Sequence, residues 1–349
     1  NNNAFAACHS LTSMNIPVSV KSIGELAMPY GPATNAKFES IYYEKIWGGR
    51  DLETFRDNLP DGDIGESWDI ACHQNGTGVV ANGYLKGKKF DEIIAEFGYA
   101  LVGSKVSTEK FPLLVKLINS REKLSVQVHP GDEYAQRVEN QFGKTEAWYI
   151  LDCDEGAQLI YGFNKELTRD EFKKSIEDNT FLDYVNKVNV KKGDVFFIEA
   201  GTLHAIGGGI LLAEVQQNSN TTYRVYDYGR LQNGKPRELH VEKALDVTNT
   251  VPPTRNGDAD GELEAFENAT HQALCSCEFF KMETIDVKGE HTILVDDESF
   301  VSVLILEGKG TLTDETQTLQ VNAGDSFFVP ANCGDITFNG EFKALISTL

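Results

Sequence analysis

One short stretch of this sequence occurs twice, and the repetition restricts the possible folds more than any other feature. The segment Lys192–Ala200 (KGDVFFIEA) aligns without a gap with Ala323–Ala331 (AGDSFFVPA), 131 positions later. In both copies a Gly-Asp turn leads into an apolar run that has the composition of a β-strand. We therefore predict two related β domains that carry copies of the same strand.

The composition is typical of a globular protein with many turns. Among 349 residues, 41% are hydrophobic, 31 are glycine and 10 are proline, and the length allows two cores of roughly 100 to 200 residues each. The formal net charge of −21 argues against nucleic acids and anionic membranes as partners, because both bind basic surfaces. No apolar stretch approaches the roughly 20 residues of a membrane span. We therefore expect small-molecule or protein partners.

Helix signals and a linker signal interrupt the strand pattern. Lys89–Phe97 has the apolar spacing of an amphipathic helix, and Thr168–Glu171 (TRDE) is a capping box that opens a helical insertion at about residues 164–188. Pro252–Glu262 is rich in Pro, Gly, Asn and Asp, as linkers are. We predict three parts, namely an N-terminal extension (1–35) that is either an expression-derived addition or upstream sequence, a first β domain with the helical insertion (36–255) and a second β domain (256–349).

Three polar side chains alternate with valines in Ser125-Val-Gln-Val-His129. Successive side chains of a strand point to opposite faces, so Ser125, Gln127 and His129 share one face. Lys144 and Glu146 share a face in the same way at the start of another apolar run. These two clusters are the first candidates for a binding site.

His204 follows a glycine just past the first copy of the repeated strand. Together with Gln127, His129 and Glu146 it forms a set of two imidazoles, an amide oxygen and a carboxylate. Such a set suits a divalent cation such as zinc and leaves a position open for substrate. The alternative interpretation is a satisfied polar interior without metal.

The second copy of the repeat differs at the same positions. At the offset of the repeat, Asp335 corresponds to His204, and alignment of the neighbouring apolar runs places Val301 opposite Glu146. We therefore expect the second domain to lack a metal site and to have a structural role. A dimerisation role is equally compatible with its sequence.

Charged residues in apolar surroundings give a further set of candidates. Lys116 lies inside the apolar run Phe111–Ile118, where a lysine must reach solvent or meet an anion. Glu214 and Arg224 flank a polar stretch, and the planar guanidinium suits a phosphate or a developing oxyanion. A surface loop with a salt bridge would explain this pair equally well. The remaining histidines without a partner at ligand spacing are expected to be structural, namely His73, His240, His271 and His291.

Five short motifs occur in order along the chain: Lys45–Gly49 (KIWGG), Gln127–Pro130 (QVHP), Gly143–Glu146 (GKTE), Gly201–His204 (GTLH) and Tyr223–Asp227 (YRVYD). This series resembles type I mannose-6-phosphate isomerases (phosphomannose isomerases) of the cupin superfamily. The resemblance runs from about Phe38 to the C-terminus, and five ordered motifs are highly specific. Because the chain has no room for a large helical domain, it is similar to the short bacterial form.

The resemblance implies a mainly β fold of two cupin barrels, each a double-stranded β-helix, with a small helical insertion. It also implies interconversion of mannose 6-phosphate and fructose 6-phosphate through an enediol, with one divalent metal, preferably Zn²⁺. In that family the metal is held by the residues that match Gln127, His129, Glu146 and His204 here. The substrate and phosphate positions of the family match Lys116, Ser125, Lys144, Glu214 and Arg224.

The chemistry of such an isomerase needs one base that moves a proton between C2 and C1 and positive charge near the developing oxyanion. Glu214 is a candidate for the base, and Lys144 is its rival. Arg224 or Lys144 can supply the positive charge, while Lys116, Ser125 and Arg224 are candidates for phosphate binding.

Two other classes of function fit the same ligand pattern. Two histidines and one carboxylate also form the iron site of oxygenases, and a cupin can bind a sugar phosphate without converting it. Six cysteines without a disulfide spacing, and a start without the features of a signal peptide, favour a cytoplasmic protein. Monomer and homodimer are both compatible with the sequence.

Overall fold

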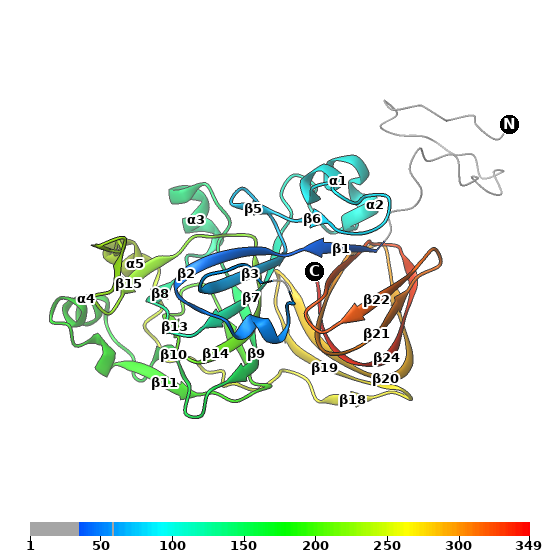
Figure 1. Cartoon of the computed structure of the whole chain (residues 1–349). Coiled ribbons are helices and arrows are strands. Elements are labelled where there is room, and N and C mark those ends of the chain that lie inside the picture. The colour runs from blue at the N-terminus through cyan, green and yellow to red at the C-terminus, as the bar shows by residue number, and fades with distance from the viewer. Residues whose placement is uncertain (1–34, 58) are drawn as a thin grey trace.

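The computed structural model describes residues 35–57 and 59–349, so nearly all of the expected N-terminal extension lies outside the described residues. β-Strands dominate the described chain, which confirms the mainly β prediction (Figure 1). None of the described helices is long and apolar enough to span a membrane. Each of the cysteines between Cys72 and Cys333 is a free thiol.

Two antiparallel sheets contain most of the strands that precede residue 250. The six-stranded sheet has the order β12 (Val195–Ile198), β9 (Glu146–Cys153), β14 (Ile210–Gln217), β7 (Leu113–Ser120), β3 (Ile64–Ile70) and β2 (Ile41–Gly49). The five-stranded sheet has the order β11 (Val185–Asn189), β10 (Gln158–Phe163), β13 (His204–Ile206), β8 (Val126–Val128) and β15 (Tyr223–Tyr226).

An apolar cluster joins these two sheets face to face. Trp148, Phe196 and Leu212 of the six-stranded sheet pack in one buried cluster with Leu159 and Ile206 of the five-stranded sheet. Period-two alternation of the strands therefore directs one side of each sheet into a shared interior. Polar side chains on this side face the same enclosed space.

Helices cover the other face of the five-stranded sheet, at the left end of the molecule in Figure 1. The predicted insertion contains α4 (Arg169–Glu177) and a 3₁₀ turn, η3 (Phe181–Asp183), and Thr168 forms the predicted capping box with Glu171. Phe172 of α4 and Leu245 of α5 (Val241–Val247) belong to the apolar cluster on this face. The helix expected at Lys89–Phe97 is α1 (Phe90–Phe97), which α2 (Tyr99–Val102) follows directly.

A nine-stranded sheet contains the C-terminal segment. Its strand order is β18 (Leu263–Ala265), β19 (Ala269–Ser276), β20 (Lys281–Val295), β24 (Gly334–Thr348), β21 (Val301–Thr313), β23 (Ser326–Val329), β1 (Ala36–Glu39) and β6 (Val79–Val80), with β22 (Thr318–Asn322) beside β21. The remaining elements are short, namely β4 (Cys72–His73), β5 (Gly76–Thr77), β16 (Leu231–Gln232), β17 (Lys235–Pro236), η2 (Asp51–Thr54) and α3 (Asp132–Glu139).

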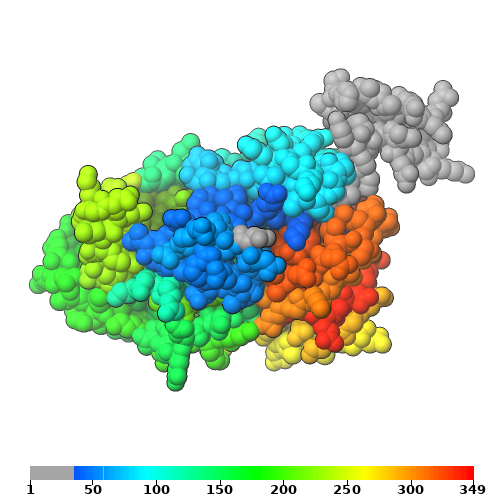
Figure 2. Space-filling model, in the orientation of Figure 1, coloured from blue at the N-terminus to red at the C-terminus, as the bar shows by residue number. Residues whose placement is uncertain are grey.

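The largest apolar cluster connects the C-terminal segment to the six-stranded sheet. Phe328 and Leu304 of the nine-stranded sheet share this cluster with Val115 of β7 and Ala213 of β14. The first described strand, β1, pairs with β23, so the N-terminal end of the described chain is part of the C-terminal sheet. Figure 2 accordingly shows residues of the first strands (blue) between the green and the orange parts of the surface.

Candidate metal centre and substrate cavity

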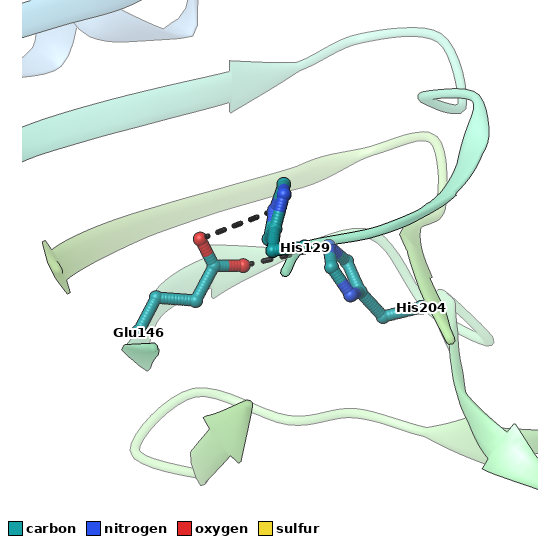
Figure 3. A group of neighbouring side chains, drawn as sticks. All are labelled: His129, Glu146 and His204. Atoms are coloured by element: carbon teal, nitrogen blue, oxygen red, sulfur yellow. Dashed lines mark ion pairs between the residues drawn. The ribbon is translucent and has the colours of Figure 1, made fainter. Parts of the chain in front are cut away.

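Three of the predicted ligands meet between the two facing sheets. His129 directly follows β8, Glu146 is the first residue of β9, and His204 is the first residue of β13. Their ligand atoms all lie within 4.8 Å of one another, and all three residues are buried (Figure 3). His129 Nε2 is 3.6 Å from one Glu146 carboxylate oxygen, and His204 Nε2 is 3.5 Å from the other. The structure therefore brings together a His-Glu-His group that can hold a metal ion.

Two local features place these side chains at strand ends. Pro130 has no N–H to donate to a neighbouring strand, and β8 ends before it. Gly201, between β12 and β13, adopts φ +90°, and an added Cβ would lie 2.9 Å from the carbonyl oxygen of Val247. A glycine is required at this turn because a side chain would be strained and would collide with the backbone.

Backbone carbonyls fix the tautomer of both histidines. His129 Nδ1 lies 2.9 Å from the carbonyl oxygen of Thr221, and His204 Nδ1 lies 2.9 Å from that of Thr202. A carbonyl oxygen only accepts hydrogen bonds, so each Nδ1 carries the proton and each Nε2 directs a lone pair towards Glu146. This is the orientation that a metal ligand requires.

Burial also keeps both rings neutral. Desolvation holds the pKa of His129 well below its usual range and lowers the pKa of His204 to about 4. His129 Nε2 is buried and has no hydrogen-bond partner among the described residues. A cation at this position would satisfy the orphaned nitrogen and offset the buried Glu146 carboxylate, so the donor set fits a metal ion.

Gln127 lies beside this group in a different role. Its side-chain Nε2 is 3.3 Å from His204 Nε2, and its Oε1 accepts a hydrogen bond from Ser125 Oγ at 3.2 Å. Gln127 and His204 are directly paired in adjacent strands, so the amide is adjacent to the centre. Its oxygen would reach an ion only after the amide turns over.

Buried lysines and glutamates form ion pairs in the interior between the two sheets. Lys116 Nζ is 2.9 Å from Glu214 Oε1 and 3.9 Å from Glu66, and Lys144 Nζ is 2.9 Å from Glu146. Burial alone would lower the pKa of Lys116, but Glu214 and Glu66 raise it. For a lysine in an apolar strand, the sequence analysis expected either exposure to solvent or contact with an anion. Lys116 contacts anions.

Glu66 was not among the residues singled out in the sequence. Burial would raise its pKa, but Lys116 and then Lys45 lower it to about 2, and Lys45 Nζ lies 3.0 Å away. Its other oxygen accepts a hydrogen bond from Trp68 Nε1 at 2.7 Å. Glu66 is therefore charged and holds Lys116 from the side opposite Glu214.

Glu214 has the electrostatic character of a base. It is buried in the middle of β14, where it is paired with Lys116 on one side and Trp148 on the other. Trp148 Nε1 donates to Glu214 Oε2 at 3.0 Å. Burial, followed by the negative charge of Glu146, raises the pKa of Glu214 above its ordinary value. A raised pKa brings a carboxylate closer to the range in which it exchanges protons near neutrality.

A cavity of about 300 Å³ opens beside these groups. Seven of the nine predicted site residues line it, and His129 and His204 are the two that do not. Residues outside the predicted site set complete the wall, namely Lys45, Trp47, Glu66, Ile118, Leu124, Trp148, Ile206, Asn220, Thr222 and Arg237.

Arginines gather at one part of this wall. Arg224 donates from Nε to Ser125 Oγ at 3.3 Å and from Nη1 to the carbonyl oxygen of Glu238 at 2.8 Å. Arg237 also lines the cavity and donates from Nε to Asp227 Oδ2 at 2.7 Å. Asp227 is buried and also forms an ion pair with Arg230. Asp227 is the buried carboxylate among these three guanidiniums and Glu238 is an exposed one near Arg224, so positive charge still exceeds negative charge in this cluster.

Comparisons with known proteins bear directly on this arrangement. Residues 36–157 match the model of the phosphomannose isomerase type I catalytic domain, and residues 270–349 match the cupin domain of mannose-6-phosphate isomerase. The chain is 37% identical to mannose-6-phosphate isomerase ManA of Bacillus subtilis over 316 residues, which cover 89% of this chain and 98% of that protein. The chain belongs to the type I mannose-6-phosphate isomerase family.

Other members of the isomerase family agree with this assignment. A mannose-6-phosphate isomerase of Streptococcus mutans is 36% identical over 311 residues, which cover 88% of this chain and 96% of that protein. The crystal structure of the mannose 6-phosphate isomerase from Bacillus subtilis superposes with a TM-score of 0.84 at 37% identity, over 91% of this chain and 100% of that one. The family expected from the five motifs is confirmed.

Several charged or aromatic residues of the cavity wall were not predicted as site residues from the sequence. Lys45 and Trp47 lie in a recognised motif, but nothing local shows that they face the cavity. Glu66 alternates with Trp68 on β3, and this period-two signal could have placed both on one face. No comparable signal marks Arg237, which reaches the cavity from the loop after β17.

Proposed function

We propose that this protein interconverts mannose 6-phosphate and fructose 6-phosphate as a metal-dependent aldose–ketose isomerase. The observation that carries the proposal is the buried His129-Glu146-His204 group at the wall of a cavity that also contains Glu214 and Arg224. The named relatives in the family support the choice of substrate. We also propose that both β domains are cupin barrels.

His129, Glu146 and His204 would hold one divalent ion, with Gln127 as a fourth ligand through its amide oxygen. Two neutral imidazoles and a carboxylate favour zinc. When bound, such an ion supplies Lewis acidity that stabilises negative charge on a sugar oxygen during isomerisation. Lys144 Nζ, 2.9 Å from Glu146, would add positive charge beside that oxygen.

Glu214 is the base that we propose for proton transfer. Its carboxylate takes the proton from C2 of the open-chain aldose, the C–H electron pair forms the double bond of an enediol, and the oxygen on C1 takes up a proton from solvent. The same carboxylic acid then returns its proton to C1, where the electron pair of the enediol double bond forms the new C–H bond, while the hydroxyl on C2 gives its proton to solvent and becomes the carbonyl, so that the proton gained at the C1 oxygen equals the one lost at the C2 oxygen. Trp148 and Lys116 keep the carboxylate oriented during both transfers. Lys144 is the alternative base.

The phosphate would bind at the arginine end of the cavity. Arg224 and Ser125 line the cavity and contact one another, and Arg224 has no carboxylate partner within ion-pair distance among the described residues. Lys116, although predicted to bind phosphate, is occupied by Glu214 and Glu66, so we assign it a role in fixing Glu214. Arg237 offers a second guanidinium whose orientation Asp227 fixes.

We also propose a cytoplasmic location, which the free thiols support, and a monomer or homodimer as the working form. The partner of the enzyme in this proposal is its phosphorylated hexose.

A coupled assay tests the proposal. Purified protein is incubated with mannose 6-phosphate, and formation of fructose 6-phosphate is followed before chelation, after chelation, and after restoration of zinc. We expect turnover that the chelator abolishes and zinc restores. Metal-loaded protein that binds the sugar phosphate without turnover would instead identify a sensor. Stoichiometric iron with oxygen uptake would identify an oxygenase.

A further inference from the structure

Two imidazoles face each other outside the candidate active site, on the nine-stranded sheet. His271 belongs to β19 and His291 to β20, and their Nε2 atoms are 2.8 Å apart. The ring centroids are 4.8 Å apart, and the ring planes are nearly perpendicular. Neither histidine has a possible metal ligand at a suitable spacing in the sequence. The fold nevertheless brings the two rings into contact with each other.

The course of β20 explains this contact. Gly289 has φ +130° and is paired with Gly340, which has φ +142°. The loop before β19 is tied to this point, because Lys288 N donates to the carbonyl oxygen of Asn268 at 2.8 Å and Asn268 Nδ2 donates to that of Glu290 at 3.0 Å. These bonds hold the start of β19 against the residues that lead to His291, so the pair rests on ordered backbone.

The surroundings leave both rings neutral and accessible. Each histidine is half-buried, and the ring of Phe266 packs 4.6 Å from His271 and 5.5 Å from His291. Burial lowers the pKa of both imidazoles, and in His271 the neighbouring His291 lowers it further. Only one proton fits between two nitrogens at this distance, so at least one Nε2 lone pair points into the gap.

We propose that His271 and His291 form a binding site for a late first-row divalent cation such as Zn²⁺, separate from the candidate active site. Zn–N bonds of about 2.0 Å place two nitrogens of a tetrahedral site roughly 3.3 Å apart. The present separation is 2.8 Å, so a small rotation of the rings would admit the ion. Imidazole pairs are preferred ligands for this class of metal.

Glu264 is the third donor that the fold offers. It is directly paired with His271 in the neighbouring strand β18, so both side chains lie on one face of the sheet. Glu264 is exposed, which leaves its carboxylate free to turn towards an ion held by the two imidazoles. Water would complete the coordination because the site is open to solvent.

A zinc titration tests the proposed His271–His291 site. The buried His129-Glu146-His204 site is filled with zinc first, so that it does not contribute to the titration. The protein is loaded with zinc, freed of excess metal by gel filtration and titrated with Zn²⁺ in a calorimeter. We expect one additional equivalent in the wild type and its loss in His271→Ala and in His291→Ala. Glu264→Gln should weaken the additional binding several-fold. Thr292→Val, which changes an exposed neighbour of His291, should retain it.

Folding and the proposed isomerase activity serve as separate controls. Thermal unfolding and turnover of mannose 6-phosphate should be unchanged in both histidine variants, since neither residue lines the cavity. An additional equivalent that persists in both variants, or binding that saturates only in millimolar zinc, would overturn the proposal. Because the result is a difference between wild type and variant, it holds even if the buried site fails to support turnover.

Discussion

Strands β9, β12 and β14 and strands β21, β23 and β24 are arranged on the same plan, yet within the described residues only the first set contributes a side chain, Glu146, to a metal-capable group. In each set, the strand with the repeated motif begins after a glycine with positive φ, Gly193 at +92° and Gly324 at +85°. Each of these strands then pairs in antiparallel register with the preceding long strand. The frame is therefore shared, and the difference lies in a few side chains.

Cross-strand register identifies those side chains. Glu146 is paired with Ile198, and Val301 is paired with Val329, which stands at the same place in the repeat as Ile198. The alignment that placed Val301 opposite Glu146 is therefore confirmed by the pairing. Val301 is buried in an apolar cluster and offers no ligand atom.

The same comparison extends to the proposed base. Glu214 is paired with Trp148, and Ile346 is paired with Val303, the residue that corresponds to Trp148. A buried carboxylate needs lysines to offset its desolvation, whereas a buried isoleucine stabilises the fold directly. The inner face of the first set thus carries charged groups beside an apolar cluster, whereas these positions of the second set are part of an apolar core.

The largest effect is expected from the comparison of His204 with Asp335, which occupy corresponding positions in the two copies of the repeat. His204→Ala removes one of three ligands, and loss of Lewis acidity worth several kcal/mol should reduce kcat/KM at least about 10³-fold. Asp335→Ala, an exposed change, should leave it unchanged. Steady-state kinetics and zinc content measured on both variants check this. Equal activities would show that the His-Glu-His group has no part in the reaction.

The second test replaces the proposed base by its neutral isostere. Glu214→Gln should lower kcat about 10²- to 10³-fold, since general base catalysis typically contributes factors of this size. Zinc content should stay at the wild-type level because Glu214 is not among the proposed ligands. Lys144→Gln is the matched variant. If it loses proton exchange at C2 and Glu214→Gln keeps it, the roles of the two residues are reversed.

Several of the residues in these tests could be predicted from the alternation of side chains along a strand. Ser125, Gln127 and the Lys144–Glu146 pair follow from period-two patterns, and the repeat itself identified equivalent strands. Such patterns are local, so they are visible in the sequence. His129 was predicted to share a strand with Ser125 and Gln127, but β8 ends at Val128; His204, predicted just past the first copy of the repeated strand, is the first residue of β13.

Contacts that depend on long-range register were not predicted. Glu66 reaches Lys116 because β3 pairs with β7, and no local signal specifies which residues of two distant strands lie opposite. The ion pair between Arg237 and Asp227 depends on a loop in the same way. The short helix α3 was also missed, and the sequence offered only Pro130 and Gly131 before it as a turn signal.

A third test concerns the positive charge of the arginines at the cavity. Among the described residues, the apolar core of strands β21, β23 and β24 has no such charge at its centre. Arg237→Ala should raise KM for mannose 6-phosphate about 10- to 100-fold with little change in kcat, because a charge-assisted hydrogen bond contributes about 1.5 to 3 kcal/mol. Lys235→Ala removes an exposed cation from β17, two residues before Arg237, and should not affect KM. An equal effect of both variants would point to general electrostatic attraction instead of a defined phosphate contact.

The smallest expected effect is at Ile346, the residue that occupies the place of Glu214 in the C-terminal set. Ile346→Val removes one buried methyl group and should lower the free energy of unfolding by about 0.5 to 1.5 kcal/mol, as such truncations do. Its kcat/KM should equal that of the wild type, because the side chain packs in an apolar cluster away from the cavity. Denaturant unfolding and the coupled assay on one preparation measure both quantities. A changed kcat/KM with unchanged stability would mean that the C-terminal strands influence the site, and the division of roles between the two sets would then be wrong.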